Sequence, residues 1–304
     1  MPGSERGPVD ERDQLAERFE EQRDRLTGVA HRMLGSRGEA EDAVQETWLR
    51  LARVDPDEVG NLPAWLRTVL TRICLDLLRS RRARPEDLTD QVPDPAPRPG
   101  GPARPDGDPE EEALLADSVS RALLVVLDTL DPAERIAFVL HDMFAVPFAQ
   151  IAPIVARSPA ATKKLGGRAR QKVQGTPVVP PALLVQQRQV VSAFLAAARA
   201  GDLAGVLTVL APDAVRYADA GARPPGAPAV IRGARAVAEG TVLLAARSRQ
   251  AELALVNGTA GLIVAPGGRL RFALTFAVED GRITEYTVIG DPERLSGLAL
   301  AVLE

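Results

Sequence analysis

The sequence from residue 147 to residue 173 reads PFAQIAPIVARSPAATKKLGGRARQKV. Pro147 is suited to open a short helix that ends near Arg157. Ser158 and Pro159 then supply an N-cap and a first-turn proline for a second helix that runs to about Val173. Two helices joined by a tight turn at residues 156–158 have the spacing of a helix-turn-helix. The alternative interpretation is an ordinary helical hairpin with a charged tail.

The second of these helices is strongly basic. The chain has only three lysines, and all of them lie between residues 157 and 172, a stretch without any acidic residue. A helix-turn-helix places its second helix in the major groove of DNA, where side chains contact phosphates and base edges. The residues predicted to do so are Arg157, Thr162, Lys163, Lys164 and Arg168.

Two features weaken this predicted motif. Pro153 lies inside the first helix, where a proline costs about 3 kcal/mol or bends the helix. Gly166 and Gly167 lie inside the second helix, at about 1 kcal/mol each relative to alanine. We therefore predict a helix-turn-helix that is soft when it is not bound to DNA.

The N-terminal part of the chain is predicted to be helical throughout. Apolar residues recur at helical spacing over residues 18–34, 39–53 and 62–80. In the second of these helices Val44, Trp48 and Leu51 face inward, and the opposite edge carries acidic, amide and apolar side chains. The residues of that edge are Asp42, Gln45, Glu46 and Leu49. Such an edge suits docking on a basic helical partner, although most faces of this kind are merely solvated.

The third N-terminal helix ends in a basic tract. Residues 67–84 hold six arginines and one acidic residue, Asp76. The spacing of Arg67, Arg72 and Arg79 places them roughly on one side of a helix, where they can follow a phosphate backbone. The alternative is a solvated helix face.

Proline-rich segments divide the chain. Its 304 residues are enough for two or three domains. Residues 85–109 hold eight prolines, and residues 85–112 hold nine acidic against two basic side chains, which indicates a flexible acidic linker. Further prolines at 177, 180 and 181 mark a short second linker. The predicted divisions are residues 1–84, 85–112, 113–175, 176–181 and 182–304.

Residues 182–304 change from helical spacing to alternation. An amphipathic helix over 183–200 and a short second helix are followed by strand-like runs, which predicts an α+β domain with a curved antiparallel sheet. Residues 231–247 are predicted to form a helix. The polar candidates near strand ends are Tyr217, Asp219, Arg232 and Tyr286. A buried Asp–Arg pair there has two interpretations, a catalytic one and a structural one.

Composition excludes several classes of chemistry. A single cysteine, Cys74, makes no internal disulfide, and two histidines leave little for a metal site or His-based catalysis. No cofactor is predicted. The chain has no apolar run of about 18 residues, and its N-terminus has no apolar signal core, so we expect a cytoplasmic protein.

In combination, these motifs resemble a known family. Residues 40–51, AEDAVQETWLRL, together with WLRTV at 65–69 and DLLR at 76–79, look like region 2 of extracytoplasmic-function (ECF) RNA polymerase sigma factors. LDPAER at 130–135 and the helix-turn-helix look like region 4. FVLHDMF at 138–144 and SPAAT at 158–162 resemble the subgroup that carries a C-terminal SnoaL-like domain. The resemblance covers nearly the whole chain.

The resemblance implies a fold of several domains: two all-α sigma domains, followed by an α+β SnoaL-like cone. It also implies partners. Asp42, Gln45, Glu46 and Leu49 would bind the coiled coil of the β′ subunit of core RNA polymerase, and region 4 would meet the β flap. The melted −10 promoter element would be handled by Asn61, Trp65, Arg67, Arg72 and Arg79, and the −35 element by the helix-turn-helix.

The resemblance also implies that the C-terminal domain contacts the sigma domains in cis and regulates them. Two motifs resemble those of the subgroup: DAGARPPG at 219–226, beginning with Asp219, and GDPERL at 290–295, containing Asp291. The alternative is that both are plain turns. Ala156 occupies a turn position where the family usually has glycine.

These observations predict a sigma factor that is not a catalyst. One rival is a SnoaL-like hydrolase or cyclase with a helical DNA-binding appendage, which predicts turnover by residues 182–304. Another is a DNA-binding regulator that does not engage polymerase, for which the helix over 39–53 would be dispensable.

Overall fold

The computed structural model describes residues 8–55, 59–83, 121–243 and 248–303, and these fall into two compact units. The first unit comprises residues up to 119 together with Pro132–Lys163. The second comprises Ser120–Asp131 and Lys164–Glu304. The predicted acidic linker over 85–112 lies outside the described residues.

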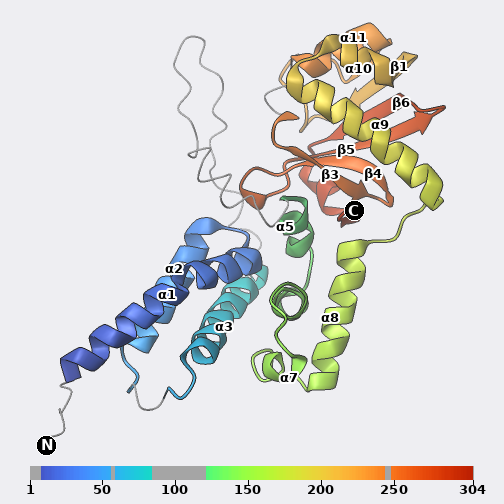
Figure 1. Cartoon of the computed structure of the whole chain (residues 1–304). Coiled ribbons are helices and arrows are strands. Elements are labelled where there is room, and N and C mark those ends of the chain that lie inside the picture. Colours follow the sequence, from blue (N-terminus) through green and yellow to red (C-terminus); the bar gives the residue numbers. More distant parts are fainter. Residues whose placement is uncertain (1–7, 56–58, 84–120, 244–247, 304) are drawn as a thin grey trace, which may run out of the picture. The chain divides into compact units, whose positions relative to one another are not determined.

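The first unit is built on a bundle of three long helices (Figure 1): α1 (Pro8–Leu34), α2 (Arg37–Leu51) and α3 (Leu62–Ala83). Each helix directs its apolar positions at the other two, and the core includes the fully buried Phe19, Met33, Leu51, Leu66 and Leu70. The three predicted N-terminal helices are confirmed, and each differs from its predicted bounds at one end or both.

The remaining helices of this unit are short. α6 (Pro132–Phe138) contacts α3 and continues into a π-helical turn, η3 (Val139–Met143), which contacts α1. α7 (Phe148–Ile151) is only four residues long and ends well before Arg157, so the predicted length of this helix is wrong. Pro153 explains the difference, because it has no N–H to continue the hydrogen-bond ladder. The longer helix α8 (Pro159–Gln174) follows as predicted, and from Lys164 on it belongs to the second unit.

The second unit contains a seven-stranded sheet of order β2-β1-β6-β5-β4-β3-β7. Its strands are β1 (Leu210–Ala218), β2 (Val230–Arg232), β3 (Ala251–Val256), β4 (Thr259–Val264), β5 (Phe272–Glu279), β6 (Arg282–Ile289) and β7 (Leu300–Ala301). The order β3, β4, β5, β6 follows from antiparallel hairpins between chain neighbours. β1 pairs with β6 in parallel, so the predicted all-antiparallel sheet is wrong at this pair.

Helices cover this sheet. α9 (Pro181–Ala200) crosses the sheet and contacts β3, β4 and β5 (Figure 1), while α10 (Leu203–Val209) and α11 (Ala234–Val242) pack against β1. The core between helices and sheet includes Phe194, Phe276 and Tyr286, whose rings contact one another. The helix predicted over 231–247 is wrong at its start, because residues 230–232 form β2. A 3-10 turn, η4 (Pro266–Gly268), and the short α13 (Pro292–Ser296) complete the unit.

Two segments from the predicted region 4 belong to this second unit. α5 (Arg121–Asp128) contacts β3, β7 and η4. The C-terminal end of α8 is joined to the sheet by a hydrogen bond from the backbone N–H of Val302 to the carbonyl of Val173, 2.9 Å long. Gly175, at φ 65°, lies so close to Ala301 that a Cβ on Gly175 would collide with the Ala301 Cβ. α5 and the C-terminal end of α8 are therefore part of the packing of the second unit.

The expected fold class, helical regions followed by an α+β domain, is confirmed. Among the described helices, none has an apolar stretch long enough to cross a bilayer.

Candidate functional site

The outer edge of α2 is the first candidate surface. The inner face of this helix is buried through Ala40, Ala43, Val44, Thr47 and Leu51. On the other edge Asp42 and Gln45 are exposed, Glu46 is half-buried, and Leu49 is 42% exposed. Leu49 is thus the apolar part of an edge whose other side chains are carboxylates and an amide.

Glu46 already has a neighbour on its own helix. Its Oε1 lies 3.0 Å from Nε of Arg50, and both side chains are nearly half exposed. Such an i,i+4 pair contributes only about 0.3–0.5 kcal/mol. A partner that offers a better cation can therefore displace Arg50 at little cost.

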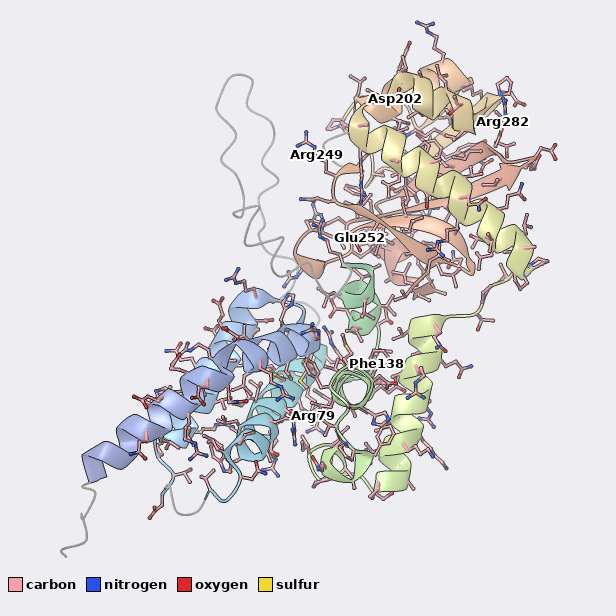
Figure 2. The ribbon with its side chains drawn as sticks, in the orientation of Figure 1. Arg79, Phe138, Asp202, Arg249, Glu252 and Arg282 are labelled. Carbon is pink, nitrogen blue, oxygen red and sulfur yellow. The ribbon has the colours of Figure 1, made fainter. Side chains whose placement is uncertain are left out.

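The second candidate surface is α3. Asn61 caps this helix: its Oδ1 accepts a hydrogen bond of 3.0 Å from the N–H of Ala64. Arg72 and Arg79 are exposed, and Arg79 (labelled in Figure 2) is only loosely paired, 3.8 Å from Asp76. Trp65 is half-buried.

Arg67 does not share the face of Arg72 and Arg79, and that part of the prediction is wrong. Five helical residues turn the chain by about 140°, whereas seven bring it back to nearly the same side. Arg67 is half-buried, and its Nη2 donates a 2.9 Å hydrogen bond to Oε1 of Gln150, which precedes the helix-turn-helix turn. Partial burial lowers the pKa of Arg67, which stays a cation.

The third candidate surface is the exposed side of α8. The turn before it requires a positive φ at Ala156 (54°), and the N–H of Arg157 closes it on the carbonyl of Ala152. The hydroxyl of Ser158 caps the helix by accepting a hydrogen bond of 3.2 Å from the N–H of Ala161. The cationic residues Arg157, Lys163, Lys164 and Arg168 are exposed.

Thr162 does not lie with these cations. It is fully buried, and its hydroxyl donates to the carbonyl of Ser158. Thr162 therefore packs inside the motif, and the prediction that it faces DNA fails because its helical position points inward. Gly166 and Gly167 do not interrupt α8.

Asp219 and Asp291, the two motif residues of the C-terminal domain, are brought together. The Asp219 carboxylate accepts hydrogen bonds from the N–H groups of Ala222, Gly290 and Asp291, at 3.0–3.2 Å. It also lies 3.1 Å from Nη1 of Arg294. Asp291 in turn caps α13 by accepting from the N–H of Arg294. Asp219 therefore pairs with Arg294 and not with the candidate Arg232, which is exposed on β2, and its contacts are those of a loop anchor.

Glycines make this junction possible. A Cβ on Gly221 would collide with the carbonyl oxygen of Gly290, and a Cβ on Gly290 would lie 2.7 Å from the nitrogen of Ala222. The two predicted motifs thus touch backbone to backbone, although 71 residues separate Asp219 from Gly290.

A fourth feature joins β3 to α5. Oε2 of Glu252, labelled in Figure 2, accepts a hydrogen bond of 3.0 Å from the backbone N–H of Ala122. Its other oxygen lies 3.8 Å from Nε of Arg121. Sequence reasoning missed Glu252, because nothing local indicates that an acidic residue on a strand will meet a helix 130 residues earlier.

Comparison with known proteins places these features in a family. Residues 18–84 match the model of Sigma-70 region 2. The chain is 38% identical over 301 residues to the ECF RNA polymerase sigma factor SigJ of Mycobacterium tuberculosis H37Rv, covering 93% of each chain. It is 33% identical over 279 residues to "Probable ECF RNA polymerase sigma factor SigI" of strain CDC 1551, covering 90% of this chain and 92% of that one. A solved structure of SigJ from M. tuberculosis matches with a TM-score of 0.44 and 34% identity, covering 93% of this chain and 98% of that chain.

The chain therefore belongs to the ECF RNA polymerase sigma factors. Membership of this family implies a function in transcription initiation with core RNA polymerase and promoter DNA.

Proposed function

We propose that the protein binds core RNA polymerase through the edge of α2 formed by Asp42, Gln45, Glu46 and Leu49. The observation that carries this proposal is the exposed Leu49 within an otherwise acidic and amide edge, on a helix whose opposite face is buried. The complementary partner surface is helical and basic, which is the character expected of the β′ coiled coil. A positively charged residue of the partner would form its most favourable new ion pair with Asp42, because no ion pair of Asp42 is found among the described residues, whereas Glu46 already pairs with Arg50.

For promoter DNA, we propose that the exposed cations of α3 and α8 bind phosphates and base edges. Arg72 and Arg79 lie at the −10 element, together with Asn61, Trp65 and Arg67. Arg157, Lys163, Lys164 and Arg168 lie at the −35 element, and region 4 meets the β flap. Removing one phosphate-binding cation should reduce the slope of log affinity against log salt by about 1.

The C-terminal domain, we propose, regulates region 4 in cis and is not an enzyme. The contacts of α5 and of the end of α8 with β3 and β7 support this proposal. A domain that holds the first and last helices of region 4 can set how readily the helix-turn-helix reaches the −35 element. In the Asp219 junction every contact is to backbone or to Arg294, which supports a structural task for these motifs.

The test of polymerase binding uses the full-length protein and core RNA polymerase from the source organism. Asp42→Arg combined with Glu46→Arg, and separately Leu49→Asp, are compared with Asp24→Arg, a charge reversal at an exposed position of α1. We expect the α2 variants to show at least tenfold weaker core affinity and no run-off transcription, while Asp24→Arg behaves as the wild type. Core binding that is unchanged in both α2 variants would refute the proposed surface.

Regulation in cis is tested separately, with Glu252→Ala and with Glu239→Ala as the control. Glu239 lies in the same domain but pairs only with Arg235 on the surface of α11. We expect Glu252→Ala to change run-off transcription more than threefold while core affinity stays constant. Equal transcription by both variants and the wild type would contradict a regulatory role for the bond between Glu252 and α5.

A further inference from the structure

A pocket lies inside the C-terminal domain between α9, α11 and the sheet. It has an empty volume of about 620 Å³, part of which is open to solvent. Its walls are mostly apolar: the larger side chains are Phe194, Leu195, Leu262, Val264, Phe272, Leu274 and Val288. The concave shape and apolar lining are those of sites for small molecules.

Arg216 is the one charged residue among those that line the pocket. It lies on β1, in register with Ile231 of β2 and Tyr286 of β6, and is only 7% exposed. Its Nη1 is 3.9 Å from where a Cβ on Gly240 of α11 would stand, so a helix residue without a side chain leaves room beside the guanidinium. Among the described residues, no ion pair or hydrogen bond engages the Arg216 side chain.

The polar neighbours do not neutralise this charge. The hydroxyl of Tyr286 is 2.8 Å from that of Thr241, which itself donates to the carbonyl of Val237. The proton of Tyr286 is therefore directed at Thr241. Burial raises the pKa of Tyr286, so the phenol stays neutral at physiological pH and provides no counter-charge. The pocket lining contains no Asp or Glu.

A cation that faces a pocket with mostly apolar walls is poorly solvated, and an anion that enters the pocket stabilises it. One guanidinium matches one carboxylate, which it can bind through two parallel hydrogen bonds. A dianionic phosphate would keep half of its charge uncompensated against apolar walls. The lining also lacks His, Cys, Asp and Glu, so its hydroxyl groups have no general base among the lining residues to activate them, and it favours binding over turnover.

We propose that this pocket binds a mostly apolar monocarboxylic acid, with its carboxylate on Arg216 and its hydrocarbon part against the phenylalanine, leucine and valine walls. This proposal goes beyond the sigma-factor function and is independent of polymerase binding.

The test is isothermal titration calorimetry of the full-length protein with three molecules that share one tail: octanoate, 1-octanol and octylammonium. We expect octanoate to bind at least tenfold more tightly than 1-octanol, and octylammonium not to bind. This series needs no variant, so it decides the matter even if substitutions in the pocket impair folding. No binding of octanoate, or equal binding of octanoate and 1-octanol, would overturn the proposal.

Variants then locate the charge. Arg216→Gln is expected to weaken octanoate binding by about 10- to 100-fold, which is the loss expected for a charge-assisted hydrogen bond, and to abolish the preference over 1-octanol. Arg216→Lys should retain part of the preference. Arg232→Gln, an exposed arginine on the neighbouring strand β2, is the matched control and should bind octanoate as the wild type does. Unchanged binding in Arg216→Gln, or an equal loss in Arg232→Gln, would refute a site centred on Arg216.

Discussion

Glu252 on β3 and Ala122 on α5 are joined by a hydrogen bond of 3.0 Å, from a backbone N–H to a carboxylate, across 130 residues of sequence. The first N–H groups of a helix have no partner within the helix, and a negative charge there is favourable. Glu252 thus acts as a cap for α5, although a capping residue usually comes from the chain segment next to the helix.

From this relationship we predict that Glu252→Ala loosens α5. Loss of a cap costs about 1 kcal/mol, and the effect should be local. Hydrogen–deuterium exchange followed by mass spectrometry should show faster uptake in peptides covering residues 121–128. Glu239→Ala is the control and should leave these peptides unchanged. Wild-type exchange over 121–128 in the Glu252 variant would show that the bond does not hold the helix.

The Asp219 junction gives a second prediction. Asp219→Ala leaves the N–H groups of Gly290 and Asp291 without their acceptor, and each unsatisfied group costs about 1–3 kcal/mol, whereas the N–H of Ala222 keeps the backbone carbonyl of residue 219 as an acceptor. We expect a loss of about 2–4 kcal/mol in the free energy of unfolding, measured by urea denaturation. Arg294→Ala removes only a half-exposed ion pair and should cost less than about 1 kcal/mol. Equal losses in the two variants would show that the ion pair, and not the backbone N–H groups, dominates.

Ala156→Gly should stabilise the protein. Ala156 has φ 54°, a conformation that costs an L-residue about 1–2 kcal/mol and glycine almost nothing. Glycine also has a larger conformational entropy in the unfolded chain, which reduces this gain in stability by about 0.4–1 kcal/mol. The expected net gain is about 0.5–1 kcal/mol. Ala149→Gly, at an exposed position of α7, should instead destabilise. A gain in thermal stability for Ala149→Gly, or a loss for Ala156→Gly, would contradict this account of the turn.

Cys74 should be unreactive in the native protein. It is buried in α3, and desolvation raises the pKa of its thiol from 9.0 to about 12. Only the thiolate attacks alkylating agents, so the reactive fraction at pH 8 falls by about 1000-fold. We expect slow labelling by iodoacetamide at pH 8 and fast labelling in 6 M guanidinium, on the order of the rate of a free thiol. Fast labelling without denaturant would place Cys74 outside the core of the first unit.

The sequence was sufficient where structure depends on near neighbours. Helical spacing predicted α1, α2, α3, α8 and α9, and the Ser158-Pro159 pair predicted where α8 begins. The hairpin strands β3 to β6 were also predicted, because alternation and turn residues are local signals. The basic face of α8 was predicted with one exception, Thr162, whose inward position depends on how the motif packs.

What the sequence did not indicate depends on distant partners. The parallel pairing of β1 with β6 joins residues about 70 apart, and no local pattern specifies it. Arg67 bonds Gln150, and Glu252 bonds Ala122, for the same reason. Arg216 escaped notice because an arginine in an alternating strand looks like a solvent-facing position, whereas the sheet turns it into the pocket. Residue spacing along the sequence therefore does not reveal sites that depend on contacts between residues far apart in the chain.

The attachment of α5 and of the last turn of α8 to β3 and β7 has a practical consequence for dissecting this protein. Cutting the chain after Gly175, at the predicted end of region 4, would split a packing unit. The N-terminal piece would expose the apolar face of α5 and leave Val173 without its partner, and the C-terminal piece would present an open sheet edge. A change of activity in such fragments would reflect the loss of this packing as well as any loss of regulation. α5 and the end of α8 are part of the packing of the C-terminal unit, so an intact copy of that unit has to include them.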